Sequence, residues 1–240
     1  MINYNAQLDH LFDLWEKRCP EYTFVRDGIM RNIPNENEAW FLTKRRIAFL
    51  LKDKSDGSCD DVRDWLIDNE TPNNQKNRRL GCKLFRNIAN VLYGLLNDDY
   101  NYSHVENNPQ VNECLLNMPF AYIECKKEAG KGSLKDSELK CYLNRDADFL
   151  HIELSILRPN IYVCCGWPIS EFVKEMFPQS DLFIQSNNLA YDTRTRTLIL
   201  LGYHPTARTI SPNVYFAGVM NHYMDFLKTS YGEDFLLSLK

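Results

Sequence analysis

The chain has 240 residues, of which 44% are hydrophobic and 25% are charged, and its formal net charge is −4. This length and hydrophobic content suffice for one sizeable core, and ten Gly and ten Pro do not indicate disorder. The acidic balance excludes a general attraction for nucleic acid or anionic membranes, so a polyanion would need a local basic patch. No apolar run has the length of a bilayer span, and the N-terminus lacks the pattern of a secretory signal. We therefore expect a cytoplasmic protein that does not bind membranes.

The eight cysteines have no spacing that is typical of a zinc or iron–sulfur site, and no Cys-x-x-Cys pair occurs. Cys164 and Cys165 are adjacent within an apolar run, so in a strand they would point to opposite faces. We expect reduced thiols that pack as small hydrophobic side chains, and neither a metal ion nor another cofactor.

Hydrophobic periodicity predicts an alternation of helices and strands along the chain. Helices are expected over residues 8–19, 62–66, 78–96, 138–157, 172–176 and 213–227. Strands are expected over residues 46–51, 120–123, 161–165 and 198–201. Apolar strands separated by helices indicate a three-layer α/β/α fold with a mostly parallel central sheet. We treat the chain as one domain, with a core at 46–227 and a packed N-terminal helical extension at 1–45.

Each predicted strand ends in a polar loop, and in a parallel sheet these loops converge on one edge, where ligands bind. The last loop contains His204, which follows an apolar strand and lies between Gly202 and Pro205. This imidazole is either a functional group or a turn histidine that hydrogen-bonds to the backbone. Asp53 and Asp56, in the first loop, are either functional carboxylates or turn and cap residues.

The order of these loops resembles the uracil-DNA glycosylase superfamily. Members carry a Gly-Gln-Asp-Pro-Tyr-His-Gly motif after the first strand, an Asn at the end of a later strand, a helix–Pro–strand–Gly unit and a late His-Pro-Ser. The corresponding stretches here are residues 51–57, 122–125, 157–166 and 204–207. The resemblance covers roughly residues 46–219 and implies the three-layer fold of that family.

By this resemblance the chain would cleave the N-glycosidic bond of a flipped base in DNA, without a cofactor. Asp53 would position or activate the attacking water, and His204 would stabilise negative charge on the departing base. Glu124 stands where the family has an Asn that offers a donor and an acceptor. An ionised Glu only accepts, so it would either suit an amino-bearing base edge or point away from the base altogether. The remaining candidate ligand-binding residues are Lys52, Asp56, Lys127, Gly166 and, as a phosphate contact, Arg208.

Two other classes of function stay open. A nucleic-acid or nucleotide binding module would use the same loops without hydrolysis, and a metal-dependent α/β hydrolase would hold a divalent cation with Asp53 and Asp56. The chain has neither a Gly-x-Ser-x-Gly nucleophile elbow nor a P-loop, which argues against a serine hydrolase and an NTPase. DNA, single-stranded or damaged, is the expected partner.

Overall fold

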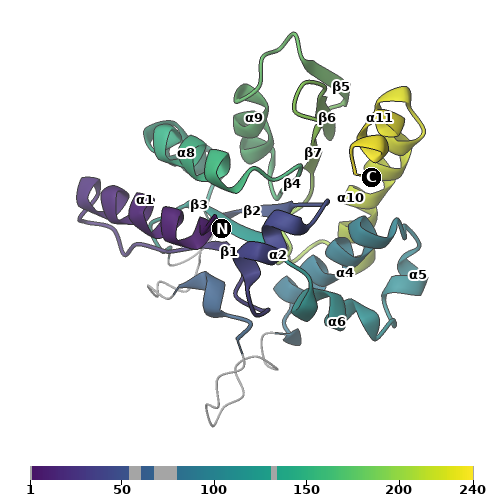
Figure 1. Ribbon diagram of the computed structural model, residues 1–240, viewed down its shortest axis with the longest axis horizontal. Coiled ribbons are helices and arrows are strands. Elements are labelled where there is room, and N and C mark those ends of the chain that lie inside the picture. Colours follow the sequence, from purple (N-terminus) through teal and green to yellow (C-terminus); the bar gives the residue numbers. More distant parts are fainter. Residues whose placement is uncertain (1, 54–60, 68–79, 131–133, 240) are drawn as a thin grey trace.

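The computed structural model describes residues 2–53, 61–67, 80–130 and 134–239. In this part of the chain, seven strands form one sheet in the order β1-β3-β2-β4-β7-β6-β5 (Figure 1). The four predicted strands are confirmed and lie parallel to one another at its centre. They are β2 (Ile47–Asp53), β3 (Ala121–Lys126), β4 (Ile161–Cys164) and β7 (Thr197–Leu201).

Three further strands make the edges of the sheet antiparallel, so the prediction of a mostly parallel sheet is wrong. They are β1 (Gly28–Ile29), β5 (Leu182–Ser186) and β6 (Leu189–Asp192). Antiparallel neighbours can be joined by a tight turn and need no crossover helix. The alternation of strands and helices along the sequence therefore gives no sign of the β5–β6 hairpin.

Helices cover both faces of the sheet, which makes three layers (Figure 1). On one face lie α4 (Lys83–Asn97), α5 (Tyr102–Val105), α6 (Gln110–Asn117), α10 (Pro212–Leu227) and α11 (Ser230–Ser238). On the other lie α1 (Tyr4–Arg18), α2 (Glu36–Leu42), α7 (Asp136–Arg145), α8 (Ala147–Leu157) and α9 (Trp167–Glu175). A short 3-10 helix, η1 (Val62–Asp64), begins after Asp61, whose side chain accepts the Arg63 N–H.

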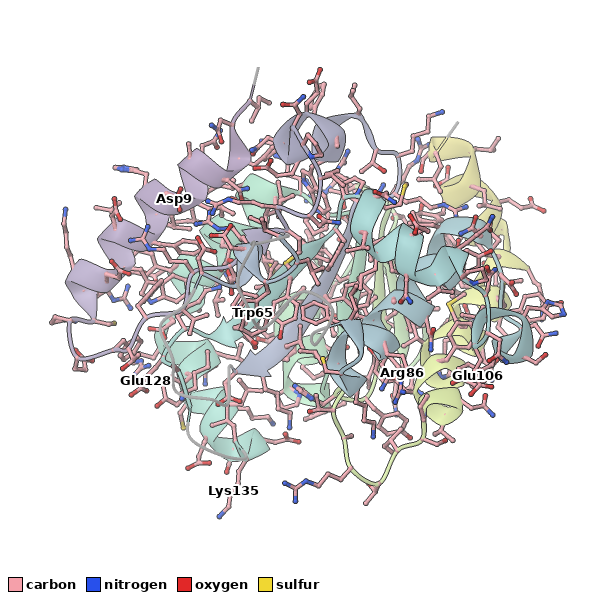
Figure 2. All side chains as sticks on the ribbon, turned by 90° about the horizontal axis from the view of Figure 1, so that it is seen from below. Asp9, Trp65, Arg86, Glu106, Glu128 and Lys135 are labelled. Atoms are coloured by element: carbon pink, nitrogen blue, oxygen red, sulfur yellow. The ribbon has the colours of Figure 1, made fainter. Side chains whose placement is uncertain are left out.

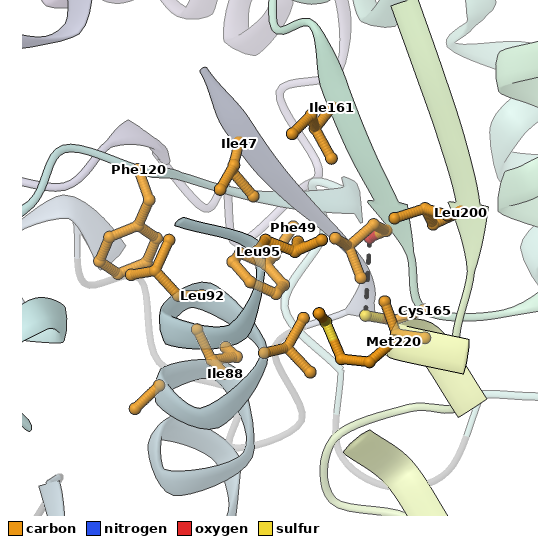
Figure 3. Packing of buried hydrophobic residues seen from close by; sticks show 14 of the residues in the cluster. Ile47, Phe49, Ile88, Leu92, Leu95, Phe120, Ile161, Cys165, Leu200 and Met220 are labelled. Atoms are coloured by element: carbon orange, nitrogen blue, oxygen red, sulfur yellow. Dashed lines mark hydrogen bonds between the residues drawn. The ribbon is translucent and has the colours of Figure 1, made fainter. Parts of the chain in front are cut away.

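The strands bury their side chains on both faces, as their continuous apolar runs predict. Phe49 packs toward Leu92 of α4 and Met220 of α10, as Figure 3 shows. Cys165 lies on that same face while Cys164 lies on the opposite one, which confirms the expected alternation. Each fully buried apolar side chain stabilises the fold by about 1.5–3 kcal/mol relative to an exposed one. The described cysteines are all free.

The helical prediction differs from the structure where a polar side chain is buried. The expected single helix at 138–157 is two helices, α7 and α8, which meet at Asp146. Asp146 is fully buried, its backbone leaves the helical region, and its carboxylate accepts hydrogen bonds from Arg145. A short acidic side chain with a local partner competes with helix continuation.

Lys127, a candidate ligand-binding residue, lies in the interior beneath the end of β3. Its Nζ donates to both carboxylate oxygens of Asp27 at 2.6 Å and to Glu153 Oε1 at 3.0 Å, and all three side chains are fully buried. A buried ion keeps its charge only when it is paired and hydrogen-bonded. The Lys127 ammonium is therefore engaged in joining three segments of the fold and has no surface exposed to a ligand.

We expect Lys127→Met to lower the free energy of unfolding by about 3–5 kcal/mol, because it leaves the buried carboxyl groups of Asp27 and Glu153 without the cation that they share. Met keeps most of the aliphatic volume of Lys, so the loss of stability reports on the missing charge. Urea denaturation measures the free energy of unfolding. The matched control is Lys135→Met, since Lys135 projects from the surface (Figure 2) and should change stability by less than about 0.5 kcal/mol. A Lys127→Met protein as stable as the wild type would contradict this account of the cluster.

Candidate functional site

A cavity of about 460 Å³ opens at the carboxyl edge of the parallel strands. It is lined by Lys52 of β2, Gly166 and Trp167 after β4, and Tyr203 and His204 after β7. Because β3 and β4 lie on opposite sides of β2, the chain connections diverge there, and such a point leaves a crevice for a ligand. The structure thus brings together three of the candidate residues, Lys52, Gly166 and His204.

The imidazole of His204 hydrogen-bonds within its own turn, as one of the two alternatives predicts, and it also lines the cavity. Its Nδ1 accepts the backbone N–H of Thr206 at 3.3 Å and lies 2.9 Å from Thr206 Oγ1. Because an amide N–H can only donate, Nδ1 carries no proton, and we assign the proton of the neutral ring to Nε2.

Burial lowers the pKa of His204 to about 4, and the positive charge of Lys52 adds to this effect. The ring is therefore neutral at physiological pH and offers an Nε2–H donor. Lys52 is held by an ion pair between its Nζ and Asp136 Oδ1, at 2.5 Å. Gly166 makes room for it, since a Cβ at this glycine would lie 3.2 Å from Lys52 Cε and its φ of 151° disfavours other residues.

Helix α4 fixes the loop that carries His204. Asn87, fully buried in this helix, donates from Nδ2 to the carbonyl oxygen of Pro205 at 2.7 Å. Lys83 donates from Nζ to the carbonyl oxygens of Ala207 and, at 2.8 Å, Ile210. The sequence analysis missed both of these positioning residues. Asn87 could have been found, because a polar side chain on the apolar face of a helix, near Leu84 and Ile88, needs a buried hydrogen-bond partner.

Asp53, the candidate water-activating acid, lies at the same edge of the sheet but does not line the described cavity. It is the last residue of β2 and stands opposite Lys126 of β3. Burial raises the pKa of Asp53, while the charges of Lys126 and Lys52 oppose this and favour the carboxylate. Asp56 lies outside the described residues, as do the other residues of the first loop after Asp53.

Glu124 is buried close to Asp53, on the face of the sheet that packs against α4. Its Oε1 accepts the hydroxyl of Tyr122 at 2.9 Å, and its Oε2 has no hydrogen-bond partner among the described residues. Burial raises the pKa of Glu124 to about 8 against the opposing effect of Tyr122, and the nearby Asp27 and Asp53 raise it further. At neutral pH the side chain is mostly a carboxylic acid with one donor and one acceptor, which corrects the expectation of an acceptor only.

Two polar residues at the cavity were not foreseen. Asn188, in the turn between β5 and β6, has Nδ2 2.8 Å from Nε2 of His222 in α10, and both line the cavity. The hairpin that presents Asn188 is the one that the strand pattern did not reveal. Arg208, the candidate phosphate contact, is exposed on the loop after His204 and does not line the cavity.

Comparison of the sequence with models of known protein families and with curated proteins finds no match. Among the described residues, no three His, Cys, Asp or Glu side chains are grouped so that they could hold a metal ion. Across the same residues, no helix combines the length and the hydropathy needed to cross a bilayer. At this edge of the sheet the cavity presents the His204 imidazole, while the carboxyl groups of Glu124 and Asp53 lie outside its lining.

We expect Glu124→Gln to remove a pH dependence of stability. The Glu124 carboxyl titrates at about 8 in the fold and near its ordinary value of 4.5 in the unfolded chain. The folded state therefore binds the extra proton in this window, and the wild type loses stability as the pH rises through it. Relative to Glu124→Gln, the loss is on the order of 4 kcal/mol.

Urea unfolding at about pH 5 and about pH 8.5 measures the difference between the two proteins. Glu21→Gln, at an exposed site, serves as the control and should follow the wild type at both pH values. If the stability difference between Glu124→Gln and the wild type is the same at both pH values, Glu124 is not protonated in the fold.

Proposed function

We propose that this protein is a base-excising hydrolase similar to the uracil-DNA glycosylase superfamily, which cleaves the N-glycosidic bond of a flipped, altered base in DNA. The observation that carries the proposal is the position of the His204 imidazole, fixed by its turn, in a cavity at the carboxyl edge of the parallel strands. The order of the motifs in the sequence supports it independently.

The chemistry of the bond explains why such an imidazole is suitable. When the C1′–N bond breaks, its electron pair leaves with the base, so the base gains negative charge and the sugar gains positive charge. A neutral donor such as the His204 Nε2–H can stabilise the charge on a base oxygen. A water then supplies the new C1′–O bond and its proton goes to Asp53. The departing base takes up one proton from solvent while Asp53 releases one, so the products are a free base and an abasic sugar.

By the resemblance, Glu124 would contribute to recognition of the base, but it is buried and does not line the described cavity. In its protonated form it presents the same pair, one donor and one acceptor, as the Asn that the resemblance places at this position. Its Oε2 is buried and has no hydrogen-bond partner among the described residues, so the base would have to reach this atom from the neighbouring cavity. A base edge with an acceptor beside a donor is complementary to it.

One observation favours the alternative, a nucleic-acid or nucleotide binding module without hydrolysis. Asp53 does not line the cavity that contains His204, so the acid and the imidazole do not share its described walls. A site that holds a base without an acid near the sugar would bind the nucleotide but would not cleave its N-glycosidic bond.

The test is the release of free base from single-stranded oligonucleotides that contain uracil, hypoxanthine or a damaged base. We expect release by the wild type, and a rate lower by about 10²–10³-fold in His204→Ala, because one charge-stabilising donor is lost. Asp53→Asn should also lose turnover, while the Kd of both variants stays within about threefold. His10→Ala, at an exposed site on α1, should retain the wild-type rate.

Binding of these oligonucleotides without release of any base would reject hydrolysis and support the binding module. A His204→Ala protein with the wild-type rate would reject the role of the imidazole.

A further inference from the structure

Two exposed aromatic side chains flank the cavity. Trp167 is 49% exposed and Tyr203 is 50% exposed, and both line the cavity that holds His204. They follow β4 and β7, which are neighbours in the sheet, so the two rings come from adjacent strand ends. Aromatic side chains are usually buried, and two half-exposed rings at one cavity indicate a surface that a ligand covers.

Both rings are supported by neighbouring helices. The Nζ of Lys140 in α7 lies 4.7 Å from the centroid of the Trp167 ring, a cation–π contact. Tyr203 lies against α10 at Gly218, where an added Cβ would be 3.4 Å from Tyr203 Cε2. These contacts restrict the positions of the two rings, so less side-chain conformational entropy is lost when a ligand stacks on them.

The charges near the rings favour an anionic ligand. Lys140 places its ammonium against Trp167, and Lys52, whose Nζ is paired with Asp136, lies in the same cavity wall. A nucleotide has the matching chemistry, because its base can stack on an aromatic ring while its phosphate lies near a cation.

We propose that Trp167 and Tyr203 form a stacking clamp for unpaired bases of single-stranded DNA that flank the nucleotide in the cavity. The inference rests on the proposed function for the nucleotide in the cavity, but it concerns binding of the strand and not cleavage. In a duplex the flanking bases are already stacked on one another and offer no free face. The clamp therefore selects single strands.

The clamp also explains how an acidic chain can bind DNA. With a net charge of −4, the protein gains little from general attraction to phosphates, and stacking supplies most of the affinity. The salt dependence of binding should therefore be shallow, since few counterions are released.

The test uses a fluorescein-labelled single-stranded oligo-dT of about ten nucleotides, with binding followed by anisotropy and by tryptophan fluorescence. Of the other three tryptophans, Trp15 and Trp40 are fully buried, and Trp65 is partly buried against the core and does not line this cavity. Stacking should therefore quench mainly the emission of Trp167. We expect Trp167→Ala and Tyr203→Ala each to weaken binding by about 5- to 100-fold, and Trp167→Phe to retain most of the affinity. Tyr100→Ala removes a ring that is 58% exposed outside this cavity and should leave the Kd unchanged.

Three results would overturn the clamp: no binding of oligo-dT by the folded wild type, alanine variants with the wild-type Kd, or a duplex that binds as tightly as the single strand. These outcomes are separable from those of the base-release assay. Quenching and tight binding without any base release would reject the proposed hydrolysis and keep the clamp. Base release by Trp167→Ala and Tyr203→Ala with an unchanged Kd would reject the clamp alone.

Discussion

The hydrogen bond from the Thr206 backbone N–H to His204 Nδ1 determines what the site can do. It places the proton of the ring on Nε2, and burial together with Lys52 keeps the ring uncharged. A histidine that gained a proton here would have to break this bond, because Nδ1 would then need an acceptor. The hydrogen bond within the turn therefore persists only while the imidazole is neutral. The proposed stabilisation of a departing base depends on both this bond and the neutral ring.

Buried polar contacts hold this edge of the sheet in place from below. Asn87 and Lys83 of α4 bind the carbonyl oxygens of the loop that carries His204. Under β3, Asp27 accepts the backbone N–H of Glu124 at 2.7 Å while it also pairs with Lys127. The same ion cluster thus positions Glu124 and influences its protonation, since Asp27 raises the pKa of Glu124 and Lys127 lowers it.

Features that depend on local pattern could be predicted from the sequence. The central strands are buried on both faces, so they read as continuous apolar runs, and their common direction places Lys52, Gly166 and His204 at one edge. The β5–β6 hairpin could not be predicted in this way, because β5 is only half-buried and lacks a clear apolar pattern. Asn188, which the hairpin presents, was missed for the same reason.

Features that depend on burial in the folded chain could not be predicted from the sequence. Lys127 is typical of a solvated loop lysine, yet its partner Asp27 is 100 positions away, and only the fold brings the two together. Burial raises the pKa of Glu124 because the interior excludes the water that would solvate its charged form. Neither residue type nor spacing in the sequence indicates this burial.

The most direct test of the account is an NMR titration of His204 in uniformly ¹⁵N-labelled protein, assigned with His204→Ala. We predict ¹⁵N shifts of a neutral ring with the proton on Nε2, and a pKa of about 4 in place of the ordinary 6.5. A ring that titrates near 6.5, or one whose neutral form carries its proton on Nδ1, would contradict the central claim.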